Sequence, residues 1–203
     1  GSGLAEDRQS LYSMDFDGSN FISAPNTFLN SASVFSISFW CKLNTSTSLV
    51  IIGDIVTRNQ DGFSISYDGQ WSTVRFRTMN GGNSYTDYTL AGDTNWHHFA
   101  AVYESSTNKI YHNGVLVATN SSGVPSSLAA ATGNDFRIGS DSSPTSTLYS
   151  NGKIDEVAIF SRALSAGEVS ALATASAPAN ILALSDKPVA YYPLGEQARR
   201  GSE

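Results

Sequence analysis

The sequence predicts an all-β fold, an antiparallel sandwich of two stacked sheets with one short helix near the C-terminus. Three observations lead to this prediction: short runs of alternating apolar and polar residues, turn signals between those runs, and few charges beside many aromatic rings. Only 15% of the 203 residues are charged, and the chain contains ten Phe and nine Tyr. A helical bundle would expose more Glu and Lys than this composition supplies.

The first long strand is predicted across residues 35–43, where every second residue is apolar. The residues that share its buried face are Phe35, Ile37, Phe39, Cys41 and Leu43. Because Cys41 is the only cysteine, no internal disulfide can form, and this thiol is predicted to be buried.

The next strands follow the same reasoning. Residues 49–52 form an unbroken apolar run, which indicates a strand that is covered on both sides. A second strand places Phe63, Ile65 and Tyr67 on one face. A third places Trp96, His98, Ala100 and Val102 on one face.

Two dipeptides, Asp68-Gly69 and Asn113-Gly114, predict two-residue hairpin turns of type I′. Both residues of such a turn need positive φ, which Asn, Asp and Gly tolerate best. The second turn is expected to join strands at 109–112 and 115–118. Residues 121–135 are small and polar and predict a loop.

The helix is predicted from a capping box. Ser165 is the expected N-cap and Glu168 lies three residues later, while Leu164 and Val169 can form a hydrophobic staple around them. The helix is expected to run to about Ala175 and to end before Pro178.

Five phrases in order resemble the laminin-G-like branch of the concanavalin A-like lectin/glucanase superfamily. They are Met-Asp-Phe-Asp-Gly at 14–18, Val-Phe-Ser-Ile-Ser-Phe-Trp at 34–40, Trp-His-His-Phe-Ala-Ala-Val-Tyr at 96–103, Tyr-His-Asn-Gly at 111–114, and Gly-Lys-Ile-Asp-Glu-Val-Ala-Ile-Phe-Ser-Arg-Ala-Leu-Ser at 152–165. The resemblance covers roughly residues 13 to 175. It implies that the sandwich is a jelly roll.

The resemblance also divides the chain. Residues 1–12 are interpreted as a cloning scar and leader, 13–177 as the sandwich, and 178–203 as a linker with a strand-like segment. Residues 189–196 resemble the phrase that opens a repeat of the family, so they either begin a following repeat or close this domain in a shifted arrangement. Both alternatives imply tandem repeats. Residues 189–192 are expected to pair with this domain's own sheet or with a neighbouring copy.

Catalysis is not expected, although the superfamily includes glycoside hydrolases. Those enzymes need two carboxylates that flank the scissile bond. Asp155 and Glu156 are adjacent, and consecutive strand residues face opposite sides. His97 and His98 are opposed in the same way, and no nucleophile motif lies beside them.

Calcium is the expected cofactor, because the resemblance implies that Asp17 and Asp155 approach each other and could share one structural ion. Calcium takes six to eight oxygen ligands, so carbonyls and water would complete the site. Asp61, just before a strand, matches by position a second, ligand-holding location. The alternative is that Asp17 caps a turn and that Asp155 accepts hydrogen bonds from loop amides.

Ligand contacts are expected from aromatic rings near loops. The candidates are Trp71, Tyr85 and Tyr88, together with Asp87 between the two tyrosines. Sugars place their C–H faces on such rings while polar neighbours bind the hydroxyls. The alternative is that each ring only covers the edge of the core. Trp40 and Trp96 lie in strong strand patterns and are expected to be structural.

These features predict a non-catalytic carbohydrate- or glycoconjugate-binding module of a larger surface protein, adhesin or virion protein. Its expected partners are a glycan or glycoprotein and neighbouring repeats, and its expected location is extracellular, on a cell or virion surface. A net charge of -6 argues against nucleic acid, and no apolar run reaches the length of a membrane span. The alternative function is a structural or protein-adhesion repeat without a sugar site.

Overall fold

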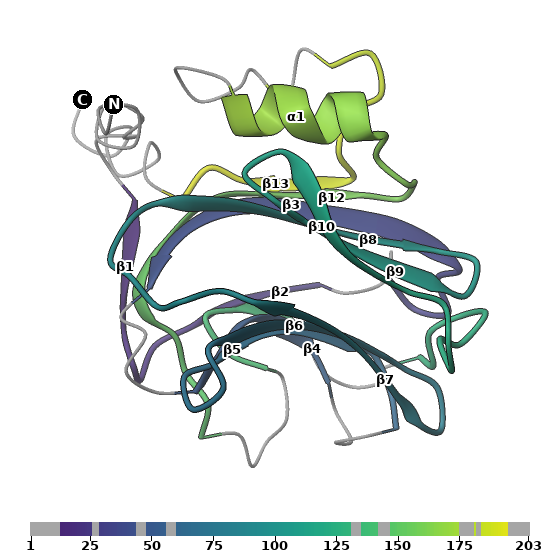
Figure 1. Ribbon diagram of the computed structural model, residues 1–203, viewed down its shortest axis with the longest axis horizontal. Coiled ribbons are helices and arrows are strands. Elements are labelled where there is room, and N and C mark those ends of the chain that lie inside the picture. The colour runs from purple at the N-terminus through teal and green to yellow at the C-terminus, as the bar shows by residue number, and fades with distance from the viewer. Residues whose placement is uncertain are drawn as a thin grey trace.

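A computed structural model of the chain describes residues 13–25, 29–43, 48–55, 60–130, 135–141, 147–174, 181 and 184–194. Two antiparallel sheets lie face to face, and the helix α1 (Ala166–Thr174) lies on the outside of one of them (Figure 1). The predicted β-sandwich with one short helix is therefore confirmed.

The first sheet has seven strands. Its hydrogen-bonded order is β1 (Met14–Asp17), β12 (Asn151–Phe160), β3 (Val34–Leu43), β8 (His97–Glu104), β9 (Thr107–His112) and β10 (Val115–Asn120), and β13 (Ala190–Tyr192) also pairs with β12. The second sheet has six strands, in the order β2 (Ile22–Ala24), β11 (Phe136–Ile138), β4 (Leu49–Asp54), β5 (Phe63–Asp68), β6 (Thr73–Met79) and β7 (Asn83–Thr89).

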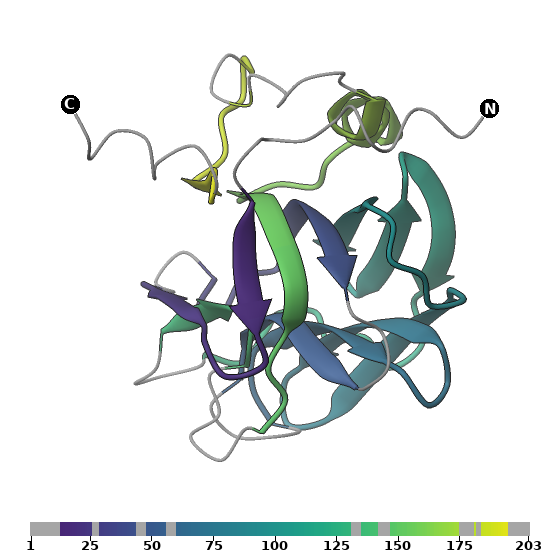
Figure 2. The same ribbon diagram turned by 90° about the vertical axis from the view of Figure 1, so that its left-hand side faces the viewer.

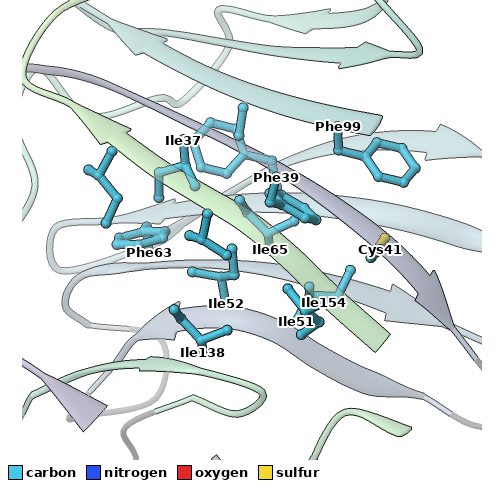
Figure 3. Packing of buried hydrophobic residues seen from close by; sticks show 14 of the residues in the cluster. Ile37, Phe39, Cys41, Ile51, Ile52, Phe63, Ile65, Phe99, Ile138 and Ile154 are labelled. Atoms are coloured by element: carbon cyan, nitrogen blue, oxygen red, sulfur yellow. The ribbon is translucent and has the colours of Figure 1, made fainter. Parts of the chain in front are cut away.

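The main core lies between the two sheets, and Figure 3 shows part of it. The predicted inward faces are confirmed: Phe39 and Ile37 of β3 and Phe63 of β5 are all fully buried. The apolar run of β4 is buried along its whole length, also as predicted. Alternation of the pleat sends every second side chain into this core and leaves the others to face outward.

A second, smaller core lies between the seven-stranded sheet and α1. Ala100 and Val102 of β8 and Phe160 of β12 pack there against Leu164 and Val169. The predicted face of β8 is thus its outer face, beneath the helix, and Trp96 precedes the strand. The opposite face, which carries Phe99 and Tyr103, enters the main core. The central strands of this sheet, β3, β8 and β12, are therefore buried on both sides along most of their length.

The capping box is confirmed. The backbone N–H of Glu168 donates to Ser165 Oγ at 3.3 Å, and the N–H of Ser165 donates to Glu168 Oε2 at 2.8 Å. Two hydrogen bonds from Arg162, at 2.6 and 3.1 Å, lower the pKa of Glu168 to about 2. The predicted end near Ala175 lies outside the described residues. None of the described residues belongs to a helix that is long and apolar enough to cross a membrane.

Ser36 on the outer face of β3 holds the segment that leads into α1. Its hydroxyl donates to the carbonyl of Arg162 at 2.8 Å and accepts the N–H of Leu164 at 2.9 Å. A buried serine at this position therefore fixes where the helix begins relative to the sheet.

The Asn113-Gly114 turn is confirmed, with φ of 48° and 84° and Val115 opposite His112. The prediction of a two-residue turn at Asp68-Gly69 is wrong. Asp68 is the last residue of β5 and pairs with Thr73, so the loop has four residues. The Asp68 carboxylate instead accepts the N–H of Gln70 at 3.0 Å, a local bond that favours a wider turn.

The C-terminal segment pairs with this chain's own sheet, which confirms that expectation. Tyr192, Tyr191 and Ala190 lie opposite Val157, Ala158 and Ile159 of β12. β1 pairs with the first half of the same strand, from Asn151 to Ile154. Figure 2 shows β1 alongside β12, with β13 near the α1 end of the sandwich. Segments from both ends of the chain thus pair with β12.

We expect Ser165→Ala to lower the free energy of unfolding by about 1 kcal/mol, because the first turn of α1 loses its N-cap. Thermal or urea unfolding measures this loss. Ser161→Ala, an exposed serine just before the helix, is the matched control and should be neutral. Equal stability of the two variants would contradict a structural role for the cap.

We expect deletion of residues 180–203 to lower both the melting temperature and the solubility. The deletion removes β13, exposes part of the β12 edge and uncovers Phe136, whose ring lies 6.2 Å from that of Tyr192. Exposed strand edges promote aggregation. A truncated protein that is as stable and as monomeric as the whole chain would show that the segment contributes nothing to this domain.

Candidate functional site

The outer face of the six-stranded sheet carries a cluster of charged and aromatic side chains. Arg75 and Arg77 come from β6, and Tyr85 and Asp87 come from the neighbouring β7. Phe76, between the two arginines, is fully buried in the main core, so alternation directs both arginines outward. No described helix covers this face, in contrast to the other sheet (Figure 1).

Within this cluster the side chains hold one another in place. Arg75 donates two hydrogen bonds to Asp87, at 2.8 and 2.7 Å, and this bond raises the pKa of Arg75. The guanidinium carbons of Arg75 and Arg77 lie 4.7 and 5.1 Å from the centre of the Tyr85 ring. Tyr85 is nevertheless 42% exposed. The ring and the two guanidinium groups therefore form one ordered surface, which we call the arginine–tyrosine cluster.

A third arginine, Arg137, lies on the same face. Two small residues, Gly53 and Ser64, separate it from Arg77 across the sheet. Arg137 of β11 is opposite Gly53, Gly53 is opposite Ser64, and Ser64 is opposite Arg77. Three strand spacings separate the backbones of Arg137 and Arg77, which is about 14 Å. The guanidinium of Arg137 lies 4.1 Å from the centre of the Phe21 ring.

Because Gly53 has no side chain, the backbone of Asp141 can lie directly against the sheet at this position. A Cβ atom there would lie 3.0 Å from the Cα of Asp141, closer than side chains normally approach. Arg137 also donates to the carbonyl of Asp141 at 3.1 Å. The backbone near Asp141 is thus fixed against the sheet between the arginines.

Four polar contacts join β6 and β7 to the opposite sheet. Asn108 of β9 donates to Thr78 at 3.0 Å, and Asn120 of β10 donates to Ser84 Oγ and to the carbonyl of Tyr85, both at 3.0 Å. The hydroxyl of Tyr88 lies 3.3 Å from His112 Nδ1. The edge strand β7, which carries Tyr85 and Asp87, is therefore bonded to the opposite sheet.

The structure brings only two of the predicted ligand residues together, Tyr85 and Asp87. Tyr88 lies on the opposite face of β7 and packs against the main core, so its expected ligand contact is not supported. Trp71 is 68% exposed, but it lies in the turn between β5 and β6, outside the arginine–tyrosine cluster. Asp61 lies at the other end of the sheet, beside the turn at 80–82.

Asp17 and Asp155 are not brought together. Asp17 is opposite Asn151, four residues from Asp155 along β12, or about 13 Å. The ion pair between Asp15 and Lys153 lies between them. One calcium ion, with ligands at about 2.3–2.6 Å, cannot span that separation. Among the described residues, no three His, Cys, Asp or Glu side chains gather into a group that could hold a metal ion.

The local bonds of these carboxylates follow the alternative interpretation. Asp17 accepts the N–H and the hydroxyl of Ser19, and these bonds lower the pKa of Asp17. Asp155 accepts the N–H of Glu156 at 2.9 Å. Glu156 has a φ of 50° and lies in a bulge of β12 against β3, so simple alternation does not apply to this pair. The side chains of Asp155 and Glu156 are both buried.

The sequence reasoning missed all three arginines of this face. Their signal was present in part, because Arg75, Phe76 and Arg77 alternate, and so do Phe136, Arg137 and Ile138. What alternation could not show is that strands distant in sequence would place these arginines on one uncovered sheet.

Comparisons with known proteins agree with this fold. A laminin G family model, described as the concanavalin A-like lectin/glucanases superfamily, matches residues 16–170. No curated protein matches the chain in sequence.

Several solved structures share the fold. A pentraxin from Limulus polyphemus has a TM-score of 0.61 at 17% identity, and the match covers 79% of this chain and 80% of the pentraxin chain. Domain 4 of an arabinanase from Geobacillus stearothermophilus, in complex with arabinotriose, has a TM-score of 0.63 at 22% identity, with 80% and 76% coverage. A sialidase carbohydrate-binding module from Ruminococcus gnavus, bound to α2,3-sialyllactose, has a TM-score of 0.60 at 16% identity, with 79% and 95% coverage. Identities this low show the fold alone.

Proposed function

Because this chain belongs to the concanavalin A-like lectin/glucanase superfamily, we propose that it is a non-catalytic module that binds a carbohydrate on the outer face of its six-stranded sheet. The arginine–tyrosine cluster is the observation that carries this proposal. It is ordered by its own hydrogen bonds, partly exposed, and located on the sheet that no described helix covers.

The chemistry of the cluster suits a sugar. Guanidinium groups donate hydrogen bonds in a fixed planar geometry, and they bind carboxylates with two parallel bonds. The Asp87 carboxylate accepts hydrogen bonds, and the exposed part of the Tyr85 ring offers an apolar surface for C–H groups. One face therefore provides donors, an acceptor and an apolar contact within two neighbouring strands.

The charge of the face favours an acidic glycan. Arg75, Arg77 and Arg137 lie on it, although the chain as a whole has a net charge of -6. Arg75 is paired with Asp87, and we propose Arg77 and Arg137 as the contacts for a ligand carboxylate or sulfate. The sialyllactose and arabinotriose in the solved relatives support carbohydrate as the ligand class, and the former is acidic.

A binding role is favoured over hydrolysis. Asp155 and Glu156 are only 4% and 8% exposed and belong to the other sheet, so they cannot reach a sugar on the proposed face. Glycoside hydrolysis by the common mechanisms requires two carboxylates beside the bond that breaks. Glycan recognition also fits an extracellular or surface protein such as an adhesin, within which this domain would be one repeat.

Calcium remains a proposal, now without the pair Asp17 and Asp155. The second candidate function is a structural or protein-adhesion repeat. The pairing of β13 with β12 favours this second function, because β13 belongs to a segment that resembles the start of a repeat and adds to this sheet.

We expect binding to acidic oligosaccharides on a glycan array, and loss of most of that binding in Arg77→Gln and in Tyr85→Ala. Each substitution removes part of the arginine–tyrosine cluster, and both positions face outward from their strands, so the core stays intact. Titration calorimetry with the best sugar measures the loss, which we expect to be at least tenfold in affinity, about 1.4 kcal/mol.

Trp71→Ala is the matched control, because it removes an exposed aromatic ring that is not part of the cluster. It should leave the affinity unchanged. If the chain binds no glycan, with or without calcium, but binds a protein receptor, the adhesion-repeat alternative is correct. If Trp71→Ala abolishes sugar binding and Tyr85→Ala does not, the sugar site lies at the loop that carries Trp71.

A further inference from the structure

A chain of four titratable side chains connects the two sheets at one end of the sandwich. Asp93 Oδ1 lies 2.8 Å from His97 Nε2, His97 Nδ1 lies 2.9 Å from His112 Nε2, and His112 Nδ1 lies 3.3 Å from the hydroxyl of Tyr88. Tyr88 belongs to β7 of the six-stranded sheet, and both histidines belong to the seven-stranded sheet. We call these four residues the histidine chain.

The histidine chain is packed rather than solvated. The His112 ring stacks on that of Phe99 at 4.9 Å, and His97 lines a small cavity between the sheets. The titratable groups that face the two imidazoles are Asp93 from the loop after β7, Tyr88 from β7, Cys41 from β3 and Tyr67 from β5. No Lys or Arg lines this cavity.

The hydrogen bonds fix the direction of every proton at neutral pH. The Asp93 carboxylate can only accept, so His97 donates from Nε2 and offers a lone pair at Nδ1. His112 then donates from Nε2 to His97 and accepts the Tyr88 hydroxyl at Nδ1. Every donor meets an acceptor in this arrangement.

One added proton can be accommodated, but a second cannot. With one proton, His97 donates at both nitrogens, and His112 reverses its tautomer and donates to the Tyr88 oxygen. With two protons, an N–H on His97 Nδ1 faces an N–H on His112 Nε2, and two positive charges lie side by side. One ring must then move to open the contact of 2.9 Å. Because His97 stays bonded to the Asp93 carboxylate, the ring that moves is His112, which also bonds Tyr88 of β7.

We infer that the histidine chain is an acid-sensitive latch, which holds β7 against the seven-stranded sheet at neutral pH and releases it when both histidines are protonated. Because β7 carries Tyr85 and Asp87 on its other face, release of this strand would also weaken ligand binding in acid. That last step rests on the proposed function, whereas the latch itself does not.

The direction of the pH effect follows from the burial of His112. Burial, and then the neighbouring His97, lower the pKa of His112 to about 4 from its ordinary value of 6.5. The unfolded chain therefore takes up a proton at this residue before the folded one does. Stability is highest above about pH 6.5 and falls as the pH drops toward about 4.

Asp93 keeps its charge in this range. Burial raises the pKa of Asp93, but the backbone bond from Asn95 and the bond to His97 outweigh burial, so the pKa lies below its usual value. The carboxylate thus remains the acceptor of the His97 N–H while the pH falls.

The test compares the melting temperatures of the wild type and His112→Gln at about pH 7 and about pH 4.5. Glutamine can donate and accept at this position but does not titrate. We expect the wild type to lose roughly 5 °C more than the variant over this interval. Asn120→Ala is the matched control, because it removes hydrogen bonds to β7 that do not titrate, and it should lose as much as the wild type over this interval.

Hydrogen exchange of the β7 amides and NMR titration of the histidines test the same inference on the unmodified chain. We expect the protection of the β7 amides to fall more than that of the central strands between about pH 7 and about pH 4.5, and His112 to titrate well below 6.5. Equal pH dependence in the wild type and His112→Gln, or titration of His112 near 6.5, would overturn the latch.

Sugar affinity measured over the same pH range separates the two hypotheses. Binding that weakens in acid in the wild type but less in His112→Gln supports the regulation of the sugar site. If no glycan binds at any pH, the proposed function fails, and the melting and exchange measurements still decide the latch.

Discussion

Burial of the central strands of the seven-stranded sheet on both faces is the constraint on which the rest of the architecture depends. Its inner face meets the other sheet through fully buried side chains such as Ile37 and Phe39, and its outer face packs against α1 and the C-terminal segment. The small hydroxyl of Ser36 lets that second layer approach and anchors its first residues. Because α1 and the C-terminal segment cover the central strands of this sheet, the face that no described helix covers is the outer face of the six-stranded sheet.

The proposed site depends on how its edge strand is held. β7 pairs on one side only, with β6, and an edge strand with one neighbour frays more readily than a central one. Hydrogen bonds from Asn120 and the histidine chain compensate by joining β7 to the opposite sheet. Polar links of this kind are directional, so they fix the register of Tyr85 and Asp87, and those that involve histidine respond to pH.

The predictions that failed have two physical causes. Some depended on contacts between segments distant in sequence, and others depended on a local backbone or side-chain feature that alternation ignores. Asp17 and Asp155 are separated by the register of β1 against β12, which no residue pattern encodes. The Asp68 side chain widened a turn that its dipeptide predicted to be tight. The bulge at Glu156 broke the alternation on which the argument about adjacent carboxylates depended.

Local patterns in the sequence determined the strands, the Asn113-Gly114 turn, the capping box at Ser165 and the inward faces, because these depend on neighbours within a few residues. The ordered phrases determined the family. The tertiary structure alone decided which sheet the helix covers, and it placed Arg137 on the same face as Arg77 and the Tyr88 hydroxyl beside His112. Those neighbours come from separate segments, and only the pairing of the sheets and the packing of one on the other bring them together.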